Sequence, residues 1–555
     1  MIYKNLKILA LLIGGILLLS GCMDLQVDNP NNPDTERALA SAADTEALVG
    51  SQFQEWWNQQ KNYPAMTLAV MGNHKTSSWG NFGMFDLGAY PRQAFQNDPS
   101  YADRFMSSTP WSVNYAAISS SIDGIVALDT GIMFASNNDE RRLRMEAFSR
   151  FIMGISYGML ANHFDKAFLV DETTDFEAIA GGTVTLDFSP YDEVLDFALA
   201  QLDEAIRLSE SGGFTLEESW INGNALTNTE LAMLARAYQA RFIVSNARST
   251  QERDAIDWAR VRDLTATVLQ EDPDFFNNRH DAFTVHADGQ FWWSRPHSLM
   301  QDATWTRVDY MLIGHTDTSG EFESWVNTPV TDRRQFVLTT PDARIAGQED
   351  VFNEDGELTG EAMRTAPGTD FSYSGPAAFP AARGLWRFSM YQHFRNNEMY
   401  LNGFVGPMQH MRITELKMYH AEALLRLDQA VSQPVVDLIN ETRVGRGGLE
   451  PVTTADSWDD VYNAMRYEFT IETHSTAAGL DFYNDRSFGN LKGKNYGALL
   501  SGTPIHFPVP AAELSLLELA AYTFGGGGEG SAPKGLSSEL RDAQEAASRR
   551  YIEMK

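Results

Sequence analysis

Apolar residues recur at helical spacing over three stretches of this chain, residues 36–70, 110–270 and 410–446. In the middle stretch, Ser189 and Pro190 precede a run with a clear apolar face. The residues of that face are Tyr191, Val194, Ala198, Leu202 and Ile206. This spacing places them on one side of an α-helix, and the Ser–Pro pair predicts an N-cap followed by proline at the first helical position.

The same spacing returns in helices that follow one another along the chain. The apolar stripe of the next helix is Leu231, Leu234, Tyr238 and Phe242. A second pair of stripes comprises Leu416, Tyr419, Ala423, Leu424 and Leu427, then Val435, Val436, Ile439 and Thr442. Helix pairs with alternating large and small residues are typical of tetratricopeptide-like repeats, in which one unit cannot bury its apolar face alone. The periodicity therefore predicts a mostly α-helical solenoid.

Two stretches, residues 72–105 and 280–405, have no sustained period and are rich in glycine and aromatic residues. Long insertions of this kind are more often functional than idle. A flat aromatic ring can stack on the apolar face of a sugar, while flanking amide or guanidinium groups bond its hydroxyls. The candidate ligand-binding residues are Trp79, Asn81, Phe82, Trp292, Trp293, Trp305, Arg307 and Tyr310. The alternative for any one of these side chains is that it fills the seam between loops and helices.

The N-terminal residues have the layout of a bacterial secretion signal. Two lysines precede an apolar run from Ile8 to Leu19, which is too short to span a bilayer. The run ends in Leu-Ser-Gly-Cys22, which resembles a lipobox, in which the cysteine becomes the acylated N-terminus. We therefore expect a signal peptide over residues 1–21, lipidation of Cys22 and an extended tether over residues 22–35.

The remaining body covers residues 36–555, and its C-terminal extension covers about residues 515–555. Composition limits what this body can do. A net charge of −31 argues against nucleic acid as a partner, because the phosphate chain would be repelled. The single cysteine excludes disulfides, thiol catalysis and a cysteine-based zinc site. We expect no metal ion and no cofactor: Gly525-x-Gly527-x2-Gly530 matches a dinucleotide fingerprint only formally, because it follows no predicted strand and opens no predicted helix. A calcium site made of Asp, Asn and carbonyl oxygens stays open as an alternative, although no loop has the required arrangement.

Two carboxylates in the last helical stretch, Glu415 and Glu422, could suggest a glycosidase pair. They are seven positions apart on one predicted helix, which separates them by about 10 Å along its axis. Capping and inter-helix ion pairs are the better interpretation of these residues. We therefore predict that the protein is not an enzyme.

Several longer motifs follow the lipobox in a fixed order. They are Trp111-x3-Tyr115-x2-Ile118, Arg236-Ala-Tyr-Gln-Ala-Arg-Phe242, Arg412-Ile-Thr-Glu-Leu-Lys-Met-Tyr-His-Ala-Glu422, Leu438-Ile-Asn-Glu-Thr-Arg443-Val-Gly-Arg446, Arg466-Tyr-Glu468-Phe, Asp485-Arg486 and Pro508-Val-Pro510-x2-Glu513-Leu514. With these motifs, residues 1 to about 515 resemble the SusD/RagB family of outer-membrane nutrient-binding lipoproteins.

The resemblance implies a fold of about four tetratricopeptide-like helix pairs backing a loop-rich ligand-binding half. It implies a lipid-anchored protein of the outer membrane that faces the cell surface. Its partner would be a TonB-dependent, SusC-like barrel, and its ligand an oligosaccharide or, in some members, a peptide. The alternative is a surface-anchored helical-repeat adaptor or hydrolase.

The chain departs from the family pattern near its C-terminal end. Glu472 is followed by Thr473-His474 and an insertion before Asp485-Arg486, and about 40 residues follow Pro510. These departures concern the C-terminal packing and the contact with the barrel rather than the fold.

Overall fold

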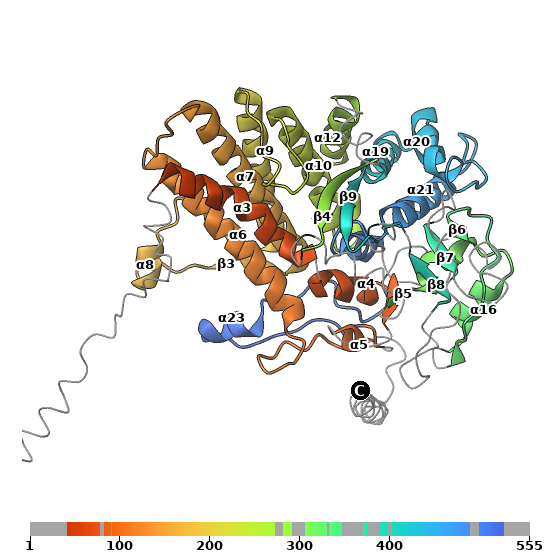
Figure 1. The fold of residues 1–555 in the computed structure, drawn as a ribbon. Helices are drawn as coiled ribbons and strands as arrows, with labels where there is room; N and C mark the ends of the chain where they lie inside the picture. Colours follow the sequence, from red (N-terminus) through yellow and green to blue (C-terminus); the bar gives the residue numbers. More distant parts are fainter. Residues whose placement is uncertain are drawn as a thin grey trace, which may run out of the picture.

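A continuous layer of helices runs along one side of the molecule, and the loop-rich segments lie against it (Figure 1). The fold is known from a computed structural model. It describes residues 41–60, 62–77, 83–89, 92–271, 281–290, 293, 306–329, 332–346, 370–373, 389–393, 395–396, 399, 402–488 and 499–526.

The long helices form the layer in chain order. They are α3 (Ala42–Trp57), α6 (Phe105–Asp129), α7 (Asn138–His163), α9 (Tyr191–Ser211), α10 (Asn228–Asn246), α12 (Trp258–Glu271), α19 (Ile413–Asp428), α20 (Gln433–Arg443) and α21 (Trp458–Thr473). Each packs on its neighbours in the series, and α12 packs on α19 although more than a hundred residues separate them. The helical layer is therefore continuous across the long insertion, and the predicted mostly helical fold is confirmed.

Short elements complete the chain. The helical ones are η1 (Asn58–Gln60), η2 (Asn62–Met66), α4 (Thr67–Met71), α5 (Met84–Leu87), α8 (Phe176–Ala180), α11 (Thr250–Asp254), α15 (Tyr310–Ile313), η3 (Gly314–Thr316), α16 (Glu321–Asn327), α22 (Leu480–Asp485), η8 (Arg486–Phe488) and α23 (Ala511–Leu516). No helix in the described ranges is long and apolar enough to cross a membrane.

The helix that was predicted after Ser189 exists, but its start differs from the prediction. The apolar stripe is confirmed, because Val194, Ala198 and Leu202 of α9 are fully buried. The predicted cap is wrong: Pro190 is the N-cap residue, with no side-chain capping bond, and Ser189 is part of a strand. That strand, β3 (Phe188–Pro190), pairs with β2 (Lys166–Phe168), so strand pairing occupies the backbone that the prediction assigned to the cap.

Three small sheets make up most of the regular structure of the loop-rich half. β4 (Ala282–Asp288) pairs antiparallel with β9 (Val405–Arg412), and β9 continues directly into α19. β1 (Lys75–Ser77) pairs antiparallel with β5 (Thr306–Val308). β7 (Phe371–Tyr373) lies between β6 (Ile345–Ala346) and β8 (Tyr391–His393). The β4–β9 pair brings the two ends of the insertion together at the edge of the helical layer.

Helix α21 contributes to two separate hydrophobic cores. Met465 and Phe469 belong to the large core of the helical layer. Tyr467 and Ile471 belong to a second core, built mainly from residues of the insertion such as Tyr310. Because residues two apart point to different sides of a helix, α21 is the element that joins the two halves.

The described part of the C-terminal extension, residues 515–526, lies along residues 94–97. The Asn97 amide donates to the carbonyl oxygens of Val509 and Tyr522, both at 3.0 Å, and its oxygen accepts from the Ala511 amide at 2.9 Å. The backbone N–H of Phe95 donates to Phe524 at 2.9 Å. This part of the extension is therefore fastened to the body; the rest lies outside the described residues.

Close packing of α7 on its neighbours requires small residues, and this gives a test of the fold. A methyl group at Gly158 would lie 2.4 Å from the ring of Phe242 on α10. Gly158→Ala should therefore lower the free energy of unfolding, because overpacking costs about 1–3 kcal/mol and alanine regains only about 1 kcal/mol of helix propensity. Urea unfolding measures the change. Gly213→Ala is the matched control, since a methyl group there meets nothing within 4 Å; equal losses in the two variants would contradict the packing.

Candidate ligand-binding site

The eight predicted ligand-binding residues divide into two groups. Five of them, Trp79, Asn81, Phe82, Trp292 and Trp305, lie outside the described residues. The other three, Trp293, Arg307 and Tyr310, are all buried.

Trp293 and Tyr310 belong to the protein core. Trp293 is 7% exposed and stacks on Phe53 of α3, with ring centroids 6.3 Å apart. Tyr310 is fully buried, stacks on Phe336 at 4.3 Å and donates its hydroxyl to the Phe336 carbonyl oxygen. The prediction placed both rings on the ligand-facing side. The structure corrects this placement, because each ring is covered by other aromatic side chains, the alternative that the sequence left open.

Arg307 occupies the middle of β5 and is 6% exposed. It lies opposite Thr76 of β1, and burial lowers its pKa to about 10. The predicted role for this guanidinium was to bond ligand hydroxyls. In the structure it is a buried part of the β1–β5 ribbon, and its role in binding stays a prediction.

The β1–β5 ribbon itself connects the two aromatic-rich segments. Its register pairs Ser77 with Thr306 at one end. Trp79 follows Ser77 by two residues, and Trp305 directly precedes Thr306. The chain therefore continues from the same end of this ribbon toward Trp79 in one aromatic-rich segment and toward Trp305 in the other.

A cluster of buried titratable groups lies next to this ribbon. His74, one residue before β1, has its Nε2 atom 2.6 Å from Asp485 Oδ2 of α22. Burial alone would lower the pKa of His74, but the nearby carboxylates, Asp485 first, outweigh it and raise the pKa. His474 Nδ1 lies 2.9 Å from Asp481 Oδ2, and burial still lowers its pKa to about 4. The His74–Asp485 contact fastens the start of β1 to the segment that follows α21, and the His474–Asp481 contact lies within that segment.

Lys75, the first residue of β1, is 2% exposed. Burial lowers its pKa to about 7, and the carboxylate of Asp481 only partly offsets this effect. A buried ammonium group is costly, so the neutral amine is favoured as the pH rises above 7.

A second, larger ionic network ties the insertion to α21, and Arg344 is its centre. The Arg344 guanidinium is fully buried and donates to Glu468 at 2.6 Å, to Glu472 at 2.9 Å and to Asp342 at 2.8 Å. Nearby, Asp370 accepts from Arg395 at 2.9 Å and from Arg446 at 2.6 Å. Burial would raise the pKa of Asp370, but these cations lower it to about 2.

The two carboxylates that resembled a glycosidase pair have structural partners. Glu415 forms a bidentate ion pair with Arg241 of α10, with bonds of 2.7 and 2.8 Å. Glu422 pairs with Arg253 of α11 and with Arg426. Both carboxylates are at most 1% exposed. The prediction of inter-helix ion pairs is confirmed.

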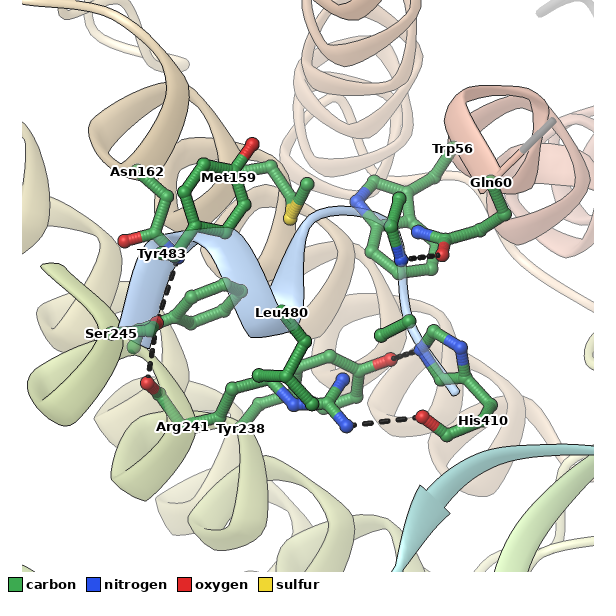
Figure 2. A pocket seen from close by; sticks show the side chains of 13 residues that line it. Trp56, Gln60, Met159, Asn162, Tyr238, Arg241, Ser245, His410, Leu480 and Tyr483 are labelled. Atoms are coloured by element: carbon green, nitrogen blue, oxygen red, sulfur yellow. Dashed lines mark hydrogen bonds between the residues drawn. The ribbon is translucent and has the colours of Figure 1, made fainter. Parts of the chain in front are cut away.

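An internal cavity of about 10 Å³ lies between α3, α7 and α10 (Figure 2). Its walls already bond one another: Tyr238 Oη lies 2.7 Å from His410 Nε2, and Asn162 donates to Ser245 at 2.9 Å. This space suits about one water molecule, whereas ligand pockets measure about 300–1,000 Å³. The cavity is therefore an interior junction and not an oligomer-binding site.

An open hollow of about 440 Å³ beside α12 also lacks the features of a sugar site. It is lined by Asp257, Ala259, Arg260, Asp263, Leu264 and Thr267, without an aromatic ring. No group of three or more histidine, cysteine or acidic side chains within the described ranges could hold a metal ion.

The sequence contained only part of the signal for these networks. Glu468, Asp485 and Arg446 lie in motifs that the sequence analysis singled out. His74 and Arg344 were missed, because His74 meets Asp485, and Arg344 meets Glu468 and Glu472, across more than a hundred residues of chain. The charged type of Arg344 alone does not distinguish a buried network residue from a surface one.

Comparison with known proteins identifies the fold. A helical-repeat layer that backs a loop-rich half, joined by buried ion pairs, defines the class. The sequence matches no protein-family model and no curated protein. Solved structures match over most of the chain. A SusD superfamily protein from Parabacteroides distasonis has a TM-score of 0.55 and 15% identity, covering 86% of this chain and 98% of that one.

Two further matches carry more specific names. Surface glycan-binding protein A from Bacteroides uniformis has a TM-score of 0.54 and 14% identity, covering 86% of this chain and 98% of the other. A SusD-like carbohydrate-binding protein from Bacteroides fragilis has a TM-score of 0.53 and 14% identity, covering 81% and 86%. The chain has the SusD fold, so the predicted resemblance is confirmed at the level of the fold.

The Arg344 network gives a prediction about stability. Arg344→Met would leave Glu468, Glu472 and Asp342 buried without their shared cation. Because an uncompensated buried charge is strongly unfavourable, the free energy of unfolding should fall by about 3–5 kcal/mol. Urea unfolding monitored by circular dichroism measures it. Arg207→Met is the control: its pair with Glu204 is largely exposed, and its loss should not be measurable. A small, equal effect in both variants would contradict the network's role.

Lys75 gives a prediction about pH. Between pH 7 and 10.5 the unfolded chain keeps a proton on this lysine that the folded protein releases. Stability should therefore rise with pH in this window, by up to about 1.4 kcal/mol per pH unit. Lys75→Met should remove this contribution, while Lys417→Met, at a partly exposed surface pair, should keep it. Urea unfolding at pH 7, 8 and 9 is the measurement, and parallel pH profiles for wild type and Lys75→Met would refute the assignment.

Proposed function

We propose that this protein is a SusD-like surface lipoprotein that captures an oligomeric nutrient, most readily a glycan, and delivers it to a TonB-dependent, SusC-like barrel. Cys22 carries the lipid anchor in the outer membrane, with the body on the cell-surface side. The observation that carries the proposal is the β1–β5 ribbon, which joins the two aromatic-rich segments on a SusD fold.

The register of the ribbon supports a shared binding face. Consecutive Cα atoms are about 3.8 Å apart, and paired strands lie about 4.8 Å apart. Trp79 and Trp305 are two residues and one residue beyond the paired Ser77 and Thr306. Chain connectivity therefore limits how far apart the two residues can be along the chain path, which is compatible with the proposal that both indoles contact one oligosaccharide.

The fold comparison supports glycan over other ligands. Both the Bacteroides uniformis and the Bacteroides fragilis proteins are named for carbohydrate binding. Their identity to this chain is 14%, so they support the class of ligand and do not indicate which glycan binds.

Binding without hydrolysis fits the chemistry of the described residues. The two helical carboxylates that sequence alone could offer for acid–base catalysis, Glu415 and Glu422, are buried against arginines. A carboxylate held in a buried ion pair can neither reach a glycosidic oxygen nor exchange protons with it. We therefore propose a protein that holds its ligand without cleaving it.

The proposal predicts that the two tryptophans act together. Trp79→Ala and Trp305→Ala should each weaken oligosaccharide binding at least about tenfold, because truncating an aromatic anchor typically costs one or more kcal/mol. Calorimetry against a panel of neutral oligosaccharides and peptides measures the affinity. Phe176→Ala, which removes an aromatic ring that is 51% exposed on α8, is the control and should bind like wild type.

Full retention of oligosaccharide affinity in both tryptophan variants would contradict the proposed aromatic binding platform. Chromatography of the products measures turnover. Cleavage of any bound oligosaccharide by the wild-type protein would contradict the proposal that the protein binds its ligand without cleaving it.

A further inference from the structure

Three leucines project into solvent immediately at and after the end of α23. Leu516, Leu517 and Leu519 are 80%, 44% and 49% exposed, whereas Leu514 on the same helix is 2% exposed. Isolated exposed leucines are normal, but three exposed leucines within four residues concentrate apolar surface in one short segment. We call these three side chains the leucine knob.

The leucine knob is held in a defined shape. The backbone N–H of Leu519 donates to the Leu514 carbonyl oxygen at 2.8 Å, and the backbone N–H of Leu517 donates to the Glu513 carbonyl oxygen at 3.2 Å. Glu518 between them has φ +57°, which is uncommon for a residue other than glycine. Backbone in this region persists only where the surroundings enforce it.

The segments around the knob are fastened to the body. Tyr522 donates its hydroxyl to Asp165 at 2.8 Å, and Asn97 clamps the chain on both sides of α23. A feature held in this way loses little conformational entropy when a partner covers it. The knob is thus preorganised for contact.

Charge decides which partner the knob fits. Glu513 precedes the leucines, Glu518 lies between Leu517 and Leu519, and the whole chain carries a net charge of −31. An anionic lipid surface would repel this segment, and so would a second copy of the chain. A protein with an apolar groove and a basic rim is the complementary surface.

The size of the knob adds a constraint. A stable interface usually buries about 800 Å² on each partner, far more than three leucine side chains provide. The knob can therefore be only the apolar centre of a wider polar contact. Anchoring both proteins in one membrane raises their effective concentration, so that a modest contact suffices.

We propose that Leu516, Leu517 and Leu519 are the docking knob by which this protein attaches to its TonB-dependent barrel. The inference rests on the proposed function and names the contact surface of its partner. In Figure 1, α23 and β5 lie at different places on the molecule, so the proposed docking surface and the β1–β5 ribbon are separate features.

The test is a pull-down from detergent-solubilised outer membrane with the acylated full chain as bait. Wild type should recover the barrel in near-equal amount. The variant with Leu516→Ser, Leu517→Ser and Leu519→Ser should recover at least tenfold less, with an unchanged melting temperature. Leu427→Ser, a leucine that is 40% exposed at the end of α19, is the matched control and should recover the barrel like wild type.

The outcomes separate this inference from the proposed function. If wild type and the triple variant recover the barrel equally, the knob proposal is wrong and the proposed function stands. If wild type recovers no barrel, the proposed partner is wrong, and the knob proposal is then wrong as well. Knob-dependent flotation with liposomes, or knob-dependent dimers in sedimentation, would also overturn the proposal by assigning the leucines to lipid or to a second copy.

Discussion

The buried contact of Arg344 with Glu468 and Glu472 is the interaction on which the arrangement of the two halves depends. Both carboxylates lie on α21, the helix that contributes to both hydrophobic cores. A helix that faced only apolar neighbours on both sides could rotate or slide with little penalty. A register that moved both carboxylates away from Arg344 would leave this buried guanidinium without its partners on α21, which is strongly unfavourable in the interior. The network thus favours one docking geometry of the two halves.

A series of packed strands connects the docking geometry of the two halves to the position of the β1–β5 ribbon. Arg344 lies beside β6, which pairs with β7, and β7 pairs with β8. β8 in turn packs on β5, whose partner is β1. On the other side, His74 and Asp485 fix the start of β1 to α22. The ribbon is therefore positioned from two directions, both of which lead back to α21 and the residues directly after it. The proposed ligand-binding face would gain its precision from such a rigid base.

Sequence periodicity was sufficient to predict the helical layer, but it was insufficient to predict the structure of the loop-rich half. The α9 stripe was predictable because a helix repeats its apolar residues locally, whereas the wrong N-cap at Ser189 arose from strand pairing with Ala167, about 20 residues away. Trp293 and Tyr310 show the limit for single residues. Their aromatic type fits a ligand platform and a core equally well, and only the neighbours Phe53 and Phe336 distinguish the two. Networks such as Arg344 with Glu468 depend on contacts 124 residues apart, which no local pattern encodes.

The interior ion pairs also determine how the surface meets its surroundings. Among the described residues, buried basic and buried acidic side chains are nearly equal in number, so the interior almost neutralises itself. In the described part of the chain, the excess of acidic over basic residues therefore lies mainly at the surface. A neutral oligosaccharide meets no electrostatic barrier at such a surface, whereas a sulfated or uronate-rich polymer is repelled over about one Debye length, roughly 8 Å at physiological salt. The same field would favour a partner with a basic rim, so under the proposed function the surface charge would act against anionic ligands and in favour of the barrel.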